Sequence, residues 1–218
     1  MLRAMGFFSR IFGRRSQPVT PPPSLDLSTV RTDWIVVGLG NPGARYAATR
    51  HNVGYMAVDD LLAPGGDVLL PVPGYQAAAA LIQIDGHDVL VLRSTTFMNL
   101  SGEAVGPVAA ALGVAPDHVI CLHDELDLPA HTVRLKLGGN ENGHNGLKSL
   151  TEHLGTRGYL RVRIGIARPP KGSSIPDYVL GPVDAGRDFD AAIALAADAV
   201  RRIVTDGLSK AQNAVHSH

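Results

Sequence analysis

Residues 34–43 read WIVVGLGNPG, an apolar run that leads directly into a glycine-rich turn. The run Trp34 to Val37 has the composition of a short buried strand, and apolar residues then follow at helical spacing: Val53, Met56, Ala57 and Leu61. The stretch therefore joins the end of a strand to the start of a helix. Ligands bind at the carboxyl ends of strands in open α/β sheets. Asn41 and His51, which both lie in this connection, are accordingly the first candidates for function.

The composition limits the class of protein. With 218 residues, of which 45% are hydrophobic and 18% charged, the chain is long enough to bury one substantial core. No apolar run reaches the length needed to span a bilayer, so we expect a soluble protein without membrane contact. Twenty basic and twenty acidic residues cancel, and a nucleic-acid partner would therefore need a local basic patch. The single cysteine, Cys121, excludes an intramolecular disulfide and fits a reducing cytoplasm.

The two ends of the chain differ from the rest. Residues 1–33 mix arginines with apolar residues and then contain a run of prolines, so we expect a basic, Pro-rich, disordered extension outside the fold. Its first part has the pattern of a short amphipathic helix able to touch a membrane or RNA, but no signal-peptide cleavage site. Residues 34–214 are expected to form the folded domain, and residues 215–218 a tail.

Helices and strands alternate along the domain. Asp85-Gly86 predicts a tight turn between two antiparallel strands, because both central positions of that turn tolerate positive φ. Ser101 is a predicted N-cap and Gly113 a predicted terminator of one helix. The remaining patterns predict strands at 118–122, 132–137 and 160–166 and helices at 144–154 and 185–204. We therefore expect a single α/β domain with a mixed, twisted sheet and helices on both faces.

Four polar clusters recur where elements meet: Asn41 with His51, Met98-Asn99, His123-Asp124-Glu125, and Gly143-His144-Asn145-Gly146. All four are placed to face one crevice. A histidine that acts as a base needs a carboxylate partner, for which Asp124 is the candidate, and asparagine amides are suited to stabilising an oxyanion. No nucleophilic side chain is evident, since Gly-x-Ser-x-Gly is absent and Cys121 lies inside an apolar strand. The attacking group would then be water, deprotonated by the histidine.

Two other kinds of site compete with this interpretation. The segment His123 to Asp127 contains residue types that bind metals, as in a hydrolase with a metal-bound water, although neighbouring residues of an extended segment point to opposite sides. The glycines of residues 38–43 also fit the dinucleotide-binding pattern, with Asp59 and Asp60 about 20 residues further on. Those aspartates fall within the predicted helix, however, and Pro42 removes a backbone donor from the turn.

Several motifs in order along the chain resemble those of bacterial-type peptidyl-tRNA hydrolase, from about Trp34 to Ala214. They are Gly38 to Gly43, Tyr46, Thr49 to Asn52, Thr96 to Gly102, His123 to Asp127, Gly143 to Lys148 and Arg161 to Ile166.

The resemblance implies hydrolysis of the ester between a peptide and the 3′ end of tRNA, which recycles the tRNA. His51 would be the general base, Asp124 its partner, and Asn41 would orient water or substrate and stabilise the oxyanion. The remaining contacts that it implies come from the substrate-binding residues Tyr46, Met98, Asn99 and Asn145. It further implies a cytoplasmic monomer with peptidyl-tRNA as its partner, no obligate protein partner, and no metal or organic cofactor.

A tRNA substrate requires contacts to phosphate, which we expect from Arg134, Lys136 and Lys148. Further candidates are Arg161, Arg163, Arg168 and Lys171. The loop at 138–143 departs from the family, because Asn140, Glu141 and Asn142 stiffen it and add a negative charge near the tRNA path. The alternative that this leaves open is a tRNA-binding protein with weakened hydrolase activity.

Overall fold

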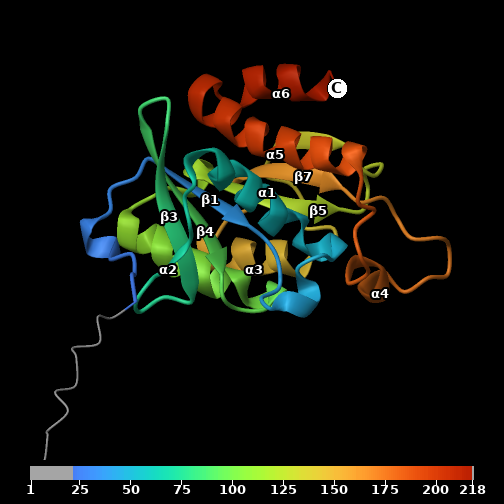
Figure 1. The fold of residues 1–218 in the computed structure, drawn as a ribbon, viewed down its shortest axis with the longest axis horizontal. Coiled ribbons are helices and arrows are strands. Elements are labelled where there is room, and N and C mark those ends of the chain that lie inside the picture. The colour runs from blue at the N-terminus through green and yellow to red at the C-terminus, as the bar shows by residue number, and fades with distance from the viewer. Residues whose placement is uncertain (1–21, 218) are drawn as a thin grey trace, which may run out of the picture.

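A computed structural model describes residues 22–217 and contains one mixed sheet between two layers of helices (Figure 1). The strands are β1 (Trp34–Gly38), β2 (Leu70–Pro71), β3 (Ala77–Ile84), β4 (His87–Ser94), β5 (Val119–Glu125), β6 (Val133–Leu137) and β7 (Leu160–Gly165). The helices are α1 (Val53–Leu62), α2 (Ser101–Leu112), α3 (Asn145–Leu154), α4 (Ile175–Val179), α5 (Arg187–Asp206) and α6 (Leu208–His216). Within the described range, no helix combines the length and hydrophobicity needed to cross a bilayer.

The seven strands lie in the order β2-β3-β4-β1-β5-β7-β6. Strands β4, β1, β5 and β7 are parallel to one another, whereas β2, β3 and β6 pair in antiparallel fashion with their neighbours. The predicted mixed sheet is therefore confirmed. Asp85 and Gly86 have φ angles of 49° and 85°, so the tight turn between β3 and β4 forms as expected.

Helices cover both faces of the sheet, as predicted: α1, α5 and α6 lie on one side, and α2 and α3 on the other (Figure 1). The core is accordingly divided into two apolar clusters. Along β1, Val36 packs in the cluster under α1 and α5, while Ile35 and Val37 pack in the cluster under α2 and α3. All three side chains are fully buried, which is why this strand is apolar without alternation.

The expected domain boundary at residue 33 is too late. Leu27 and Val30 are buried in the core, and the backbone N–H of Leu25 donates to the carbonyl oxygen of Pro71 at 2.9 Å. Residues 25–33 therefore pack against the sheet. The sequence did not indicate this contact, because the run of prolines before it is typical of a disordered segment. The predicted amphipathic helix falls in residues 1–21, outside the described part of the chain.

The expected tail at 215–218 is also placed too early. Val215 is fully buried, and α6 continues to His216. Nε2 of His216 accepts a hydrogen bond from the backbone N–H of Leu135, and Gln212 donates to the carbonyl oxygen of the same residue. Helix α6 thus provides hydrogen-bond partners for backbone groups at the outer edge of β6, the last strand of the sheet. It therefore belongs to the domain.

Two local predictions need correction, and one short helix was not predicted. Ser101 is the first residue of α2 rather than its N-cap, and its hydroxyl donates to the carbonyl oxygen of Met98, because a 3-10 turn at Met98–Leu100 runs straight into the helix. The strand expected at 118–122 extends to Glu125, so its polar residues are part of β5. Helix α4 was not predicted, since its five residues include Pro176 and are too few to show a period.

Helix α1 packs unusually close to the sheet at its first turn. A Cβ atom on Gly54 would overlap the carbonyl oxygen of Leu122 and lie 2.7 Å from that of Leu39. The glycine therefore lets the backbone of α1 contact the carboxyl ends of β1 and β5 directly. His51 lies three residues before this contact, so the same contact determines where its side chain enters the sheet edge.

We predict that Gly54→Ala destabilises the domain by about 1–3 kcal/mol, because the added methyl group overpacks a backbone contact. In an unobstructed helix the same change would stabilise the protein by up to about 1 kcal/mol. The sign of the change in the free energy of unfolding therefore distinguishes the two cases. Urea unfolding of the variant and the wild type measures the difference. A variant that is more stable than the wild type would contradict the contact.

Candidate active site

A cleft of about 490 Å³ opens at the carboxyl ends of β1 and β5. All four polar clusters found in the sequence contribute to its lining. The predicted residues that line it are Asn41, His51, Met98, Asn99, Asp124, Asn145 and Arg168. Helix α4 and the residue after it add apolar side chains to the lining: Ile175, Pro176, Val179 and Leu180.

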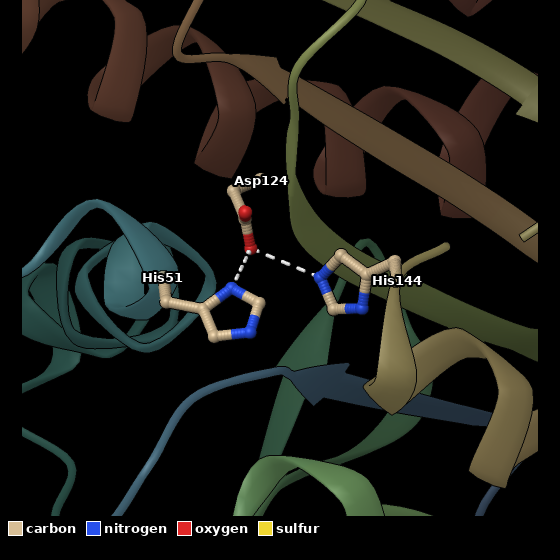
Figure 2. Close-up of side chains that lie close together, drawn as sticks. All are labelled: His51, Asp124 and His144. Carbon is tan, nitrogen blue, oxygen red and sulfur yellow. Dashed lines mark hydrogen bonds and ion pairs between the residues drawn. The ribbon is translucent and has the colours of Figure 1, made fainter. Parts of the chain in front are cut away.

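The structure brings His51 and Asp124 together. Asp124 is the second-last residue of β5 and is buried at the strand end, 4% exposed. His51 lies in the 3-10 turn Arg50–Asn52 that leads into α1, and its Nδ1 is 2.8 Å from Oδ1 of Asp124 (Figure 2). Since an ionised carboxylate can only accept, Nδ1 carries a proton, and in the neutral imidazole the free lone pair then belongs to Nε2.

A second histidine, His144, meets the same oxygen atom. Its Nε2 lies 2.9 Å from Oδ1 of Asp124, on the other side of the carboxylate from His51 (Figure 2). Nδ1 of His144 accepts hydrogen bonds from the backbone N–H groups of Gly146 and Leu147, which makes this residue the N-cap of α3. Because Nδ1 is an acceptor, Nε2 must carry the proton and donate to Asp124. His144 is therefore a neutral donor and not a base.

Sequence reasoning assigned no role to His144, although it appeared in the fourth polar cluster. Histidine is not among the preferred N-cap residues, which are serine, threonine, aspartate and asparagine. A histidine directly before a predicted helix was the available signal.

The charge of Asp124 is maintained against its burial. Burial disfavours the ionised carboxyl, but the imidazoles of His144 and His51 outweigh it and hold the pKa of Asp124 below its usual range. The preceding residue, His123, is 1% exposed and donates from Nδ1 to the carbonyl oxygen of Asp124. Burial, with His144 nearby, lowers the pKa of His123 to about 3, so this imidazole is neutral at physiological pH.

The segment His123 to Asp127 does not form the metal site considered as an alternative. Glu125 is paired with Arg163 at 2.9 Å, and Asp127 with Arg168 at 2.6 Å, so both carboxylates already have cationic partners. Among the described residues, the metal-binding side chains that do converge are His51, Asp124 and His144, and these belong to the hydrogen-bonded group above.

Asn41 is fixed by three hydrogen bonds. Its Oδ1 accepts from the backbone N–H of Met98 at 2.8 Å, while its own backbone N–H and carbonyl group both bond the side chain of Asn52 at 2.9 Å. The bond from Met98 identifies which end of the amide is the oxygen. The Nδ2 group of Asn41 is then the end that remains to donate into the cleft.

The other predicted binding residues are spread more widely. Asn99 and Asn145 are exposed at the rim, and Met98 is buried in the floor. Tyr46 is not part of the lining, and its ring instead packs edge-on against Phe97, with centroids 6.4 Å apart.

The basic residues divide into two groups. Lys136 and Lys148 are exposed on β6 and α3, outside the cleft, and Arg134 on β6 is half-buried. Arg161 is buried, and its guanidinium binds the carbonyl oxygens of Gly139 and Asn140. Arg161, Arg163 and Arg168 therefore have structural partners.

A family model described as peptidyl-tRNA hydrolase matches residues 35–218. The chain belongs to the peptidyl-tRNA hydrolase family. Similar proteins include peptidyl-tRNA hydrolase 2 of Corynebacterium glutamicum, which is 60% identical over 185 residues covering 84% of this chain and 88% of that protein. The peptidyl-tRNA hydrolase of Cutibacterium acnes is 44% identical over 196 residues, or 84% of this chain and 98% of that protein.

Solved structures agree. The crystal structure of peptidyl-tRNA hydrolase from Acinetobacter baumannii superimposes with a TM-score of 0.79 at 35% sequence identity, covering 87% of this chain and 98% of that one. As a peptidyl-tRNA hydrolase, the protein is a carboxylic ester hydrolase, and the expected family, fold and activity are confirmed.

We predict that Asn52→Ala destabilises the protein by about 2 kcal/mol, because it leaves two buried backbone groups of Asn41 without partners. The rate of hydrolysis should also fall, since Asn41 loses its fixed position. Thermal unfolding and turnover of peptidyl-tRNA measure the two effects. Asn213→Ala on the exposed surface of α6 is the matched control, and a variant of Asn52 that behaves like it would contradict the assignment.

Proposed function

We propose that this peptidyl-tRNA hydrolase acts through a water molecule that His51 deprotonates. The observation that supports this most directly is the 2.8 Å contact between His51 and Asp124 in the wall of the cleft. With Nδ1 donating to the carboxylate, Nε2 is an acceptor at the cleft surface, which is the state a general base requires.

The proton and electron pairs balance in two steps. In the first, Nε2 of His51 takes a proton from water, and the water oxygen attacks the ester carbonyl carbon to give a tetrahedral oxyanion. Asp124 stabilises the imidazolium that forms, and Nδ2 of Asn41 donates to the oxyanion. In the second, the carbon–oxygen bond to the tRNA 3′ end breaks, and the imidazolium returns its proton to the leaving oxygen. An ester suits this site because its leaving alkoxide needs less protonation than an amine.

The substrate would extend across the cleft in two directions. Asn99 and Asn145 carry paired amide donors and acceptors at the rim, suited to the peptide backbone and the tRNA 3′ end. Met98 provides an apolar floor, and Tyr46 a ring just outside it next to Phe97. The tRNA phosphates would be bound by three cationic residues, Arg134, Lys136 and Lys148.

We also propose that the active species is a cytoplasmic monomer without an obligate protein partner. The side chains to which the mechanism assigns roles, His51, Asp124 and Asn41, lie together within one copy of the chain, so the proposed chemistry needs no residue from a second copy. Cys121 is a free buried thiol, which is compatible with a reducing compartment.

The alternative of a tRNA-binding protein with weakened activity rested on the altered loop, in which Asn140, Glu141 and Asn142 add stiffness and Glu141 adds a negative charge. That carboxylate is turned inward and paired with Arg157 at 2.7 Å. It therefore presents little free negative charge to the path of the tRNA, and the hydrolase interpretation is favoured.

We predict that His51→Ala lowers kcat by about 10²–10⁴, because general-base catalysis is the contribution lost, while tRNA binding is retained. Release of peptide from peptidyl-tRNA in the presence of a chelator measures kcat, and a filter-binding assay measures affinity. His87→Ala, which removes an exposed histidine beside the β3–β4 turn, is the control. An unchanged kcat would refute the role of His51.

A separate prediction concerns tRNA contact. Lys136→Ala should raise KM, leave kcat nearly unchanged, and reduce the slope of log affinity against log salt by about one, since one phosphate contact is lost. The measurement is a salt titration of KM. Lys210→Ala on exposed α6 removes the same charge at a distance from the cleft. If both variants keep the wild-type slope, Lys136 makes no direct phosphate contact.

A further inference from the structure

The loop at 138–143 connects β6 to α3 and forms one wall of the active-site cleft. Its backbone is unusual, since Gly138, Gly139, Asn142 and Gly143 all have positive φ angles. Asn142 adopts this conformation at 49° without being glycine, which is uncommon. A loop of this kind is not held by regular secondary structure, so its position depends on contacts from its neighbours.

The side chain of Arg161 holds the first half of the loop in place through hydrogen bonds to its backbone. Arg161 is 3% exposed, and its guanidinium donates to the carbonyl oxygens of Gly139 and Asn140, both at 2.8 Å. These bonds fix the backbone as it leaves β6, but they do not reach the residues that precede α3.

Glu141 supports the second half. Its side chain is 11% exposed, and its carboxylate accepts from Nε and Nη2 of Arg157 at 2.7 and 3.2 Å and from the hydroxyl of Thr151 at 2.9 Å. Hydrogen bonding to Arg157 lowers the pKa of Glu141 to about 2, so the carboxylate is ionised at neutral pH. Two donors in a fork restrain a carboxylate in orientation as well as in distance.

The outer side of the loop is held much less firmly. Asn142 is exposed, and its amide reaches Asp127 only at 3.5 Å. Glu141 is therefore the residue through which the second half of the loop is attached to the domain.

The attachment leads directly to the catalytic carboxylate. The carbonyl oxygen of Glu141 accepts a hydrogen bond from the backbone N–H of His144 at 2.8 Å. His144 in turn donates to Asp124, which holds His51. A continuous series of short contacts thus runs from Arg157, in the middle of the α3–β7 connection, to the proposed base.

We propose that Glu141 and Arg157 are positioning residues for hydrolysis: their ion pair fixes the loop so that His144 caps α3 and donates to Asp124. This inference rests on the proposed roles of His51 and Asp124. It gives the departure of this loop from the family pattern a function, because the carboxylate of Glu141 anchors the loop to Arg157.

The experiment compares Glu141→Gln and Arg157→Gln with Glu152→Gln, which removes a negative charge, as Glu141→Gln does, but from an exposed position of α3. We expect Glu141→Gln and Arg157→Gln each to lower kcat on the order of tenfold, about 1.4 kcal/mol, with little change in KM. The double variant should lose no more than either single one, because both remove the same contact. Arg157→Lys keeps the charge and should retain more activity than Arg157→Gln.

Imidazole nitrogens report the proposed geometry independently of rate. In ¹H–¹⁵N correlation spectra of the wild type, His144 should appear as the neutral tautomer protonated on Nε2. In Glu141→Gln this signal should shift or exchange rapidly, and in Glu152→Gln it should not. If Glu141→Gln or Arg157→Gln has the same kcat as Glu152→Gln, the inference is overturned. A lower kcat with an unchanged His144 signal also overturns it, since the role would then be structural only.

The proposed function is tested separately by His51→Ala. If that variant keeps its kcat, the assignment of the base fails. The His144 signal alone then decides whether Glu141 and Arg157 position the histidine.

Discussion

The site depends on one carboxylate oxygen that accepts two hydrogen bonds. Oδ1 of Asp124 is bonded by His51 on one side and by His144 on the other. Burial at the end of β5 would favour a neutral carboxyl, and the two imidazole donors reverse that preference. Each donor also has its proton fixed: at Nδ1 of His51 by the carboxylate, and at Nε2 of His144 by its role as a helix cap. Of the imidazole nitrogens of these two histidines, Nε2 of His51 is the one left to act as a base.

The fold supplies this arrangement from three separate elements that converge where parallel strands end. Strand β5 carries Asp124, the turn before α1 carries His51, and the start of α3 carries His144. Because α1 and α3 lie on opposite faces of the sheet, their histidines reach the carboxylate from two sides (Figures 1 and 2). Gly54 makes the approach of α1 possible, and the loop at 138–143 determines the approach of α3.

Charge is organised locally rather than over the whole molecule. The net charge is zero, and many acidic groups near the cleft have an arginine partner: Glu125, Asp127 and Glu141. The pairing of Glu125 and Asp127 with arginines engages two of the carboxylates of the metal site that the sequence left open. Pairing with Arg157 changes the meaning of Glu141, which the sequence presented as a repulsive charge near tRNA and which the structure places inward as an anchor.

Much of the fold and part of the site could be predicted from the sequence, because those features depend on short-range patterns. The apolar run of β1, the Asp85-Gly86 turn and the family motifs each lie within a few neighbouring residues. Tertiary structure alone decided what depends on long-range contacts. Leu27 and Val215 become core residues only because the segments that contain them pack against the sheet. His144 becomes a hydrogen-bond donor to Asp124 only because the start of α3 lies beside the end of β5. Such contacts join residues far apart in the chain, and no local period records them.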